Sequence, residues 1–421
     1  MREMKDSGIF WVGEIPKEWS VWRNKYIFKI TKDIVLPSKN YQLLSLTTTG
    51  IKEKDENDNG GKVPENYDGY QIVKENDLVM CLFDLDCSAV FSGLSPYNGM
   101  ISPAYKVLKV KKRIANEQYY RYWFNYVGSK RFYKQYSKSL RFTLNADEFN
   151  RLFSLLPSLA EQQRIAEFLD RECGKIDGLK AEIQVQIDTL EQYKRSVITE
   201  AVTHGLNPSA PMKDSKVWYG QIPSEWKELK GKYVFKQRND RGNNVCLQLL
   251  SPTQKYGVIP QDKYEELTGM NAVKLNDSTN YALLKTIHKG DYCISLRSFQ
   301  GGFEYSEYEG VVSPAYQVFY PIITIADGYY KYLFKEKGFI DVMNSYTMSL
   351  RDGKNIAFDD FGDTFIPVPP LDEQQEIADY LDNKCAEIEQ IIADKKTQIE
   401  TLDGYKKSLI YEYVTGKKEV G

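Results

Sequence analysis

The fold is decided by a stretch that occurs twice, as Leu159-Ala-Glu-Gln-Gln-Arg-Ile-Ala-Glu-Phe-Leu169 and as Leu371-Asp-Glu-Gln-Gln-Glu-Ile-Ala-Asp-Tyr-Leu381. The offset between the copies then stays constant to Gln192-Tyr-Lys-Arg-Ser-Val-Ile198 and Gly404-Tyr-Lys-Lys-Ser-Leu-Ile410. A constant offset is typical of a long helix, because an insertion would rotate every later side chain off its face. The sequence therefore predicts one long helix in each half of the chain.

Apolar residues recur every seven positions in both stretches, which is the pattern of a coiled coil. They are Leu169, Ile176, Ile183, Leu190 and Val197 in the first stretch, and Leu381, Ile388, Leu402 and Leu409 in the second, where Lys395 interrupts the series. Prolines precede both runs, as suits a helix start. We expect the two helices to form a rod together and, if they are antiparallel, to place the preceding domains at its opposite ends. The alternative is that each helix packs only on its own domain.

The repeat extends outward from these helices. Trp11-Val-Gly-Glu-Ile-Pro-Lys-Glu-Trp19 matches Trp218-Tyr-Gly-Gln-Ile-Pro-Ser-Glu-Trp226, Ser102-Pro-Ala-Tyr105 matches Ser313-Pro-Ala-Tyr316, and Ser139-Leu-Arg141 matches Ser349-Leu-Arg351. Here the offset drifts, so loops differ in length. The predicted parts are a first domain (1–157), a first helix (158–206), a linker with a second domain (207–369) and a second helix (370–418).

The regions before the helices have the pattern of mixed α/β domains, and the fold class is α+β with a pseudo-twofold internal repeat. Strands are predicted at 77–82, 104–110, 291–296 and 315–320, where β-prone runs follow turn residues. Helices are predicted at 117–137 and 327–345. The two domains agree in outline and differ in detail.

Composition excludes several classes of protein. The chain is 42% hydrophobic, and no apolar run approaches the length of a membrane span. The first residues carry mixed charges and no signal-peptide core, so we expect a cytoplasmic protein. The six cysteines contain no Cys-x-x-Cys pair and are expected to be buried or half-buried thiols, and no metal site is predicted.

A net charge of −2 hides a segregated basic segment. Residues 111–141 contain nine Lys or Arg and one acid, Glu117, interleaved with aromatic residues. We expect the aromatic side chains to pack the domain while Lys130, Lys134, Lys138 and Arg141 project toward DNA phosphates or base edges. The alternative is a solvated basic helix.

The second domain has a weaker basic signal. The candidate DNA-binding residues there are Lys331, Arg351 and Lys354, together with a loop that precedes a Gly-Gly pair and contains Arg297, Ser298 and Gln300. Their donors suit base edges.

Catalytic motifs are missing from the sequence. The Ser-Pro-Ala-Tyr segments resemble the [DNS]-P-P-[YF] motif with which adenine methyltransferases hold a flipped base, but the second proline is absent and no Gly-rich turn for S-adenosylmethionine lies upstream. They are better interpreted as strand entries that pack Tyr105 and Tyr316 in two similar cores. The sequence contains no phosphate-binding loop motif, and neither of the two histidines lies in a pattern typical of a catalytic triad. We expect a non-enzymatic chain without a cofactor. The alternatives are an adenine methyltransferase that uses the Ser-Pro-Ala-Tyr segments and a coiled-coil scaffold that does not bind DNA.

Four features occur twice and in the same order in the two halves of the chain. They are the Gly-x-Ile-Pro-x-x-Trp openings, the Leu-x-Glu-Gln-Gln motifs, the heptad helices, and the helix ends at Ala201-Val-Thr-His204 and Tyr413-Val-Thr-Gly416. In this arrangement the chain resembles the DNA-specificity subunit of type I restriction-modification systems. The resemblance implies two target-recognition domains that read the halves of a bipartite, asymmetric DNA site. It implies that the helices are spacers that dock two methyltransferase subunits, and that restriction and translocase subunits complete the complex. One departure is the residue His204 before Gly205, which adds a position relative to the second copy.

Overall fold

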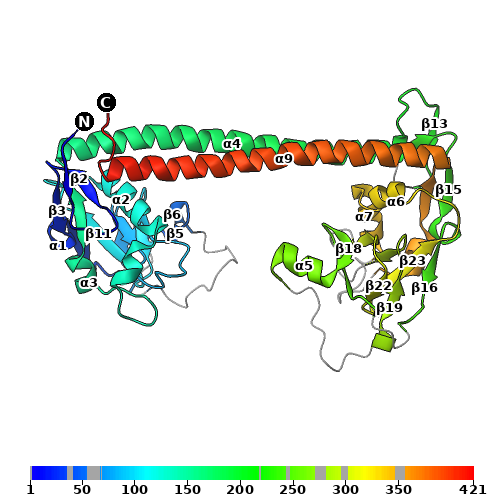
Figure 1. Cartoon of the computed structure of the whole chain (residues 1–421), viewed down its shortest axis with the longest axis horizontal. Helices are drawn as coiled ribbons and strands as arrows, with labels where there is room; N and C mark the ends of the chain where they lie inside the picture. The colour runs from blue at the N-terminus through cyan, green and yellow to red at the C-terminus, as the bar shows by residue number, and fades with distance from the viewer. Residues whose placement is uncertain are drawn as a thin grey trace. The chain divides into compact units, whose positions relative to one another are not determined.

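The computed structural model describes residues 2–35, 41–54, 67, 69–217, 220–242, 247–270, 281–294, 302–346 and 356–421. The chain divides into two compact units, one made of residues 1–184 and 396–421 and the other of residues 185–395. The long helices α4 (Leu159–His204) and α9 (Leu371–Val414) each contribute one part to both units (Figure 1). Each unit therefore consists of one mixed domain and a segment of each helix.

The first unit is built around a four-stranded antiparallel sheet in the order β4-β11-β8-β9. Four two-stranded pairs surround it: β1-β2, β3-β12, β5-β6 and β7-β10. The strands are β1 (Met4–Asp6), β2 (Glu14–Pro16), β3 (Ser20–Arg23), β4 (Phe28–Thr31), β5 (Leu44–Thr47), β6 (Gly50–Glu53), β7 (Gln71–Val73), β8 (Leu78–Met80), β9 (Ser92–Leu94), β10 (Gly99–Ile101), β11 (Lys106–Val110) and β12 (Phe153–Leu156). The helices before α4 are α1 (Asn24–Ile27), α2 (Glu117–Ser129), the 3-10 helix η1 (Phe132–Tyr136) and α3 (Ala146–Arg151).

The second unit repeats this plan with a sheet in the order β16-β23-β20-β21 and the pairs β13-β14, β15-β24, β17-β18 and β19-β22. Its strands are β13 (Met212–Asp214), β14 (Gln221–Pro223), β15 (Lys227–Lys230), β16 (Phe235–Arg238), β17 (Leu250–Thr253), β18 (Gly257–Pro260), β19 (Lys285–Ile287), β20 (Tyr292–Ile294), β21 (Phe303–Tyr305), β22 (Gly310–Val312), β23 (Gln317–Pro321) and β24 (Phe365–Val368). Its helices before α9 are η2 (Gly231–Tyr233), α5 (Gln261–Thr268), η3 (Tyr281–Leu283), α6 (Asp327–Leu333), α7 (Lys337–Ser345) and α8 (Phe358–Asp363). The mixed fold and the internal repeat are confirmed, and the four predicted strands are present as β8, β11, β20 and β23.

Both predicted domain helices are interrupted, so those two predictions were wrong in extent. The helix expected at 117–137 ends as α2, because Arg131 adopts a left-handed conformation (φ 52°), and η1 follows. The helix expected at 327–345 is divided into α6 and α7. Glu336 separates them, because its buried side chain accepts a hydrogen bond from the Phe339 amide and so caps α7.

The two long helices run antiparallel within each unit. In the first unit Lys406 pairs with Asp177 and Lys180 with Asp403, so one residue number rises as the other falls. In the second unit Lys194 pairs with Glu389, and Lys395, the residue that interrupts the heptad series, donates to Gln186. The antiparallel coiled coil predicted from the heptads is confirmed within each unit.

Heptad residues of both helices lie in the domain cores: Leu169, Ile176 and Leu409 in the first unit, and Leu381 in the second. Leu169, Ile176, Leu381 and Ile388 are buried, as is Leu409, whereas Ile183, Leu190, Val197 and Leu402 are half-buried. Each core therefore continues from the domain into the helix pair, and the helices also pack on each other.

Most of the cysteines in the described residues are buried, as predicted. Cys81, Cys173, Cys293 and Cys385 are buried free thiols, but Cys87 is exposed, contrary to expectation, because it lies in the loop after β8. Cys246 lies outside the described residues.

Within the described residues, no helix combines the length and the apolar character that crossing a membrane requires.

Candidate nucleic-acid interface

The aromatic residues of the basic segment form the core of the first domain. Tyr119, Tyr120, Trp123, Phe124 and Tyr133 are nearly or completely buried. Tyr120, Phe124 and Tyr133 pack edge-to-face or tilted against Phe28 or Phe149, with ring centroids about 5 to 6 Å apart. This packing holds α2 and η1 against the sheet, so their polar residues face outward.

The four predicted DNA-binding cations of this domain are all exposed. Lys130 follows α2, Lys134 lies in η1, and Lys138 and Arg141 lie in the loop that leads to α3. Lys134 places its ammonium 4.5 Å from the centre of the Phe142 ring. These cations thus come from three successive segments, not from one continuous helix face.

Other cations of the same segment have structural partners. Arg121 pairs with Asp170 of α4 and packs over the Tyr122 ring, and Lys111 donates to the Lys25 carbonyl oxygen at 2.9 Å. The charge count therefore overstates the basic residues that are free to meet phosphates.

In the second domain, the described residues include only Lys331 of the predicted contacts. Lys331 is exposed on α6 and lines a cleft of about 650 Å³ with Lys194, Tyr308 and Lys335. Arg297, Ser298, Gln300, Arg351 and Lys354 lie outside the described residues.

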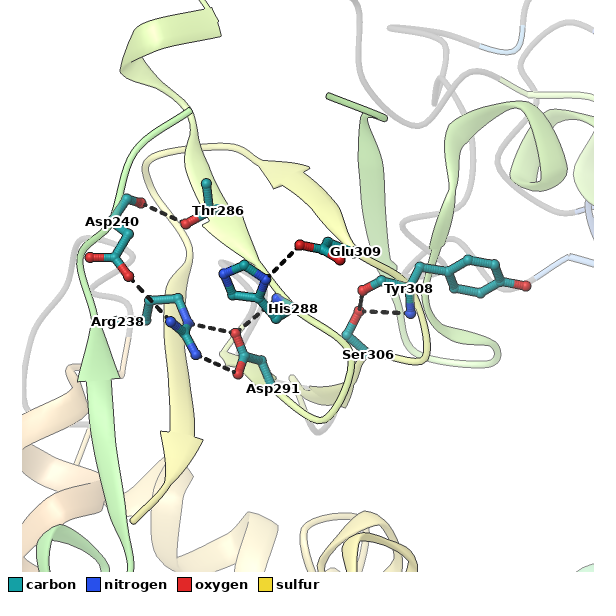
Figure 2. Close-up of polar contacts among 8 residues, drawn as sticks. All are labelled: Arg238, Asp240, Thr286, His288, Asp291, Ser306, Tyr308 and Glu309. Carbon is teal, nitrogen blue, oxygen red and sulfur yellow. Dashed lines mark hydrogen bonds and ion pairs between the residues drawn. The ribbon is translucent and has the colours of Figure 1, made fainter. Parts of the chain in front are cut away.

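A network of polar contacts fixes the turn that leads into β20 (Figure 2). Arg238 makes two hydrogen bonds with Asp291, at 2.7 and 3.1 Å, and Asp291 also accepts from the His288 amide at 2.9 Å. His288 contacts Glu309 at 2.9 Å, and Arg238 also reaches Asp240. A bidentate pair between arginine and a buried carboxylate is rigid, so the strand that leads to the predicted contact loop at 297–300 begins from a fixed turn.

The first domain has the same turn without the guanidinium. Asp77 accepts from the Lys74 amide at 2.9 Å, as Asp291 does from His288, but Thr31 stands in β4 where β16 has Arg238. Burial raises the pKa of Asp77 above its ordinary value. The two domains thus share a backbone frame and differ in the side chains that occupy it.

A further ionisable group lies beside the cleft of the second domain. Glu304 is buried, pairs with Lys335, and has one carboxylate oxygen with no hydrogen-bond partner in the structure. Burial raises the pKa of the Glu304 carboxyl from 4.5 to about 7, although Lys335 opposes the shift.

We expect this carboxyl to make stability depend on pH. Because the folded-state pKa is the higher one, the folded chain holds more protons between pH 4.5 and 7, and stability falls as the pH rises through this window. The loss is at most about 3 kcal/mol. Urea unfolding of Glu304→Gln should show a flatter pH dependence than wild type, whereas exposed Glu307→Gln should not; equal slopes for all three proteins would contradict the assignment.

Each domain is attached to the helix pair by a set of hydrogen bonds that we call the clamp. Its first part joins the two sequence motifs. Trp19 donates from Nε1 to Glu161 at 2.9 Å, and Trp226 donates in the same way to Glu373 at 2.8 Å. Both indole rings are buried. The tryptophan of Gly-x-Ile-Pro-x-x-Trp and the glutamate of Leu-x-Glu-Gln-Gln are therefore partners.

The second part of the clamp is the first glutamine of each Glu-Gln-Gln motif. Gln162 is completely buried, donates to the carbonyl oxygens of Ile114 and Pro157, both at 2.9 Å, and accepts from the Asn116 amide at 2.8 Å. One amide side chain thus satisfies three backbone groups at the junction of domain and helix.

Gln374 repeats this arrangement in the second unit. It donates to the Pro369 carbonyl oxygen at 2.8 Å and accepts from the Ala326 amide at 3.0 Å. The second glutamines, Gln163 and Gln375, are exposed and contact acids one turn further along their own helices.

Two tyrosines in each unit complete the clamp. Tyr119 donates to the carbonyl oxygen of Val414 at 3.0 Å, and Tyr329 to that of Val202 at 2.8 Å. These carbonyls lie at helix C-termini, where intrahelical donors are lacking. Tyr122 and Tyr332 donate to Asp170 and Asp382 at 2.8 and 2.6 Å. Sequence reasoning missed the clamp residues as a group, although their occurrence in both repeats was a usable signal.

The comparisons with known proteins agree with this duplicated architecture. Residues 222–401 match the type I restriction modification DNA specificity domain family. A Methanocaldococcus jannaschii protein, provisionally assigned as the specificity subunit of type I restriction enzyme MjaX, is 22% identical over 97% of this chain and 96% of its own length. The specificity-domain family thus matches the second half of the chain, and the MjaX relative resembles the chain along nearly its whole length.

Solved structures show the same fold. A chain from a type I restriction-modification system, described in a study of complex assembly and conformational transition, aligns with a TM-score of 0.68 at 14% identity, covering 96% of this chain and 99% of that one. The HsdS subunit of Thermoanaerobacter tengcongensis aligns with a TM-score of 0.50 at 13% identity, over 96% and 98% of the two chains. At such identities these likenesses show the fold alone.

Proposed function

We propose that this chain is the DNA-recognition subunit of a type I restriction-modification complex and that its two domains read the two halves of a bipartite site. The observation that carries the proposal is a constant frame with variable contents. The clamp and the central sheets repeat between the units, whereas exposed residues differ. Two domains of one design then serve two different targets.

The exposed cations supply the chemistry of binding. Lys130, Lys134 and Lys138 can neutralise phosphates, which positions the protein on the duplex, and arginine side chains can donate to guanine edges. Arg141 in the first domain and Arg297 in the second are the candidates for the latter contact. The rigid clamp contributes by holding each domain in one orientation on the helix pair.

Partners follow from the same assignment. The chain would assemble with DNA and with the other subunits of a restriction-modification complex, and α4 and α9 would be the spacers that dock two methyltransferase subunits. Methyl transfer and ATP-driven cleavage would belong to the methyltransferase and restriction subunits, while this chain would act without catalysis and without a cofactor of its own. The four-part division of the chain at 157, 206 and 369 stays a prediction.

The alternatives find no support in the comparisons. The Ser-Pro-Ala-Tyr segments form turns before β11 and β23, in which Tyr105 and Tyr316 donate their amides to Ser102 and Ser313. Both tyrosines pack beside small apolar cores, as expected for strand entries.

A change in helix length tests the spacer role. Seven residues inserted beside each member of the hydrogen-bonded pair Gln186 and Lys395 add two turns to both helices and preserve the heptad register. At 1.5 Å per residue this adds about 10 Å, or roughly three base pairs. Sequencing of methylated sites in the host should show the same half-sites with a longer gap; an unchanged gap, or altered half-site bases, would contradict the spacer role.

A further inference from the structure

The loop of residues 137–144, which connects η1 to α3 in the first unit (Figure 1), presents a leucine to solvent. Leu140 is fully exposed and has the largest exposed fraction among the exposed large hydrophobic side chains of the described residues. Isolated exposed apolar residues are common and need no function. Three further observations distinguish this one.

The loop is held in one conformation by its own hydrogen bonds. Ser139 Oγ accepts from the Thr143 amide at 2.7 Å, Ser137 Oγ donates to the Thr143 carbonyl oxygen at 2.9 Å, and the Phe142 amide donates to the Ser139 carbonyl oxygen at 3.0 Å. Phe142 has a φ of 45°, unusual for a residue with a large side chain. Leu140 is therefore the tip of an ordered turn.

The base of the loop is fixed to the segment that follows β8. The Leu144 amide donates to the Leu82 carbonyl oxygen at 2.7 Å, and the Asp84 and Leu85 amides donate to the carbonyl oxygens of Arg141 and Phe142, both at 3.2 Å. A loop fixed in this way can keep its conformation when its tip contacts a ligand.

Cations flank the leucine. Lys138 and Arg141 are exposed, and no ion pair of either is found among the described residues. An apolar tip between two cations suits duplex DNA, in which stacked base pairs form an apolar interior and the negatively charged phosphates lie on either side of it.

The tripeptide occurs again in the second half of the chain, as Ser349-Leu-Arg351, whose structure lies outside the described residues. The two domains differ in most exposed residues. An apolar residue kept beside an arginine in both copies, where it has no packing role in the copy that is described, indicates a shared contact.

We propose that Leu140 is a wedge that inserts between two adjacent base pairs of the target, while Lys138 and Arg141 hold the flanking phosphates. This proposal rests on the proposed function and adds the mode of recognition to it. Apolar side chains that enter a base step unstack it and kink the duplex, and the energy depends on the sequence of the step. The loop would thus contribute to specificity without a hydrogen bond to any base.

The test uses the complex of the full chain with its partner subunits and a duplex carrying the target read from methylated genomic sites. 2-Aminopurine is placed in turn at each position of the two half-sites, and its fluorescence is measured as the complex binds. Four proteins are compared: wild type, Leu140→Ala, Leu140→Met, which keeps an apolar wedge, and Phe10→Ala, which removes another exposed hydrophobic side chain from the same unit.

We expect a fluorescence increase at one base step, retained in Leu140→Met and Phe10→Ala and lost in Leu140→Ala. The ratio of specific to non-specific affinity should fall by roughly tenfold in Leu140→Ala. Tight specific binding with no fluorescence increase at any position, or an increase that Leu140→Ala retains, would overturn the wedge and leave the proposed function standing. Weaker assembly with partner subunits, with unstacking unchanged, would reassign Leu140 to a protein contact. Wild-type protein that binds no specific sequence would overturn the proposed function itself.

Discussion

DNA affinity should fall about a hundredfold or more when four exposed cations of the first domain are replaced together by alanine: Lys130, Lys134, Lys138 and Arg141. Each cation that contacts a phosphate releases about one counterion, so the logarithm of the binding constant should also depend less steeply on salt, by about 3 to 4 in slope. Titrations of labelled duplex at several salt concentrations measure both quantities.

A matched variant separates local contacts from overall charge. In this variant, four other exposed cations of the first unit are replaced by alanine, so that the change in charge is the same: Lys5, Lys17, Arg164 and Arg171. It should retain most of the affinity, because exposed charges further than a Debye length from the DNA are screened. Equal losses in the two variants would show that these four cations are not a binding surface.

The second large effect is expected at the clamp. Gln162→Ala should lower the free energy of unfolding by about 3 kcal/mol, because three backbone groups at the junction of the first domain and α4 lose their partner in a site that excludes water. Gln163→Ala is the control, since the neighbouring side chain is exposed and should change stability by about 0.5 kcal/mol or less.

The same comparison can be made in the other unit with Gln374→Ala and Gln375→Ala. Urea unfolding followed by circular dichroism measures each free energy. If the paired variants were equally stable, the hydrogen bonds of the buried glutamines would not hold the domains on the helices.

The long helices were predictable from the sequence to within a few residues at each end. Their seven-residue spacing continues without an insertion, although Lys395 replaces one apolar residue. Because residues at this spacing lie on one face of a helix, the prediction required no knowledge of distant partners. The strands were predictable because β-prone runs follow turn residues. Each of these predictions rests on neighbours in the sequence.

The interruptions of the domain helices could not be predicted in this way. Arg131 ends α2 in a conformation that usually favours glycine, and no local signal marks it. Glu336 divides α6 from α7 because its buried carboxylate meets both the Phe339 amide and Thr199 of α4. The second of these partners lies far away in the sequence.

The clamp was hidden for the same reason. Trp19 and Glu161 are 142 residues apart, and each belongs to a short motif that has several possible uses. Their pairing depends on how the first domain folds back on α4. The repeat offered a clue, since both motifs occur twice, but it could not say which residues touch.

Footprinting of the assembled complex on its target duplex tests the central claim most directly. Two domains of one design that read different sequences should protect two separate, sequence-specific half-sites, with a gap between them that is not read. Protection of a single continuous site, or no sequence-specific protection at all, would contradict the account.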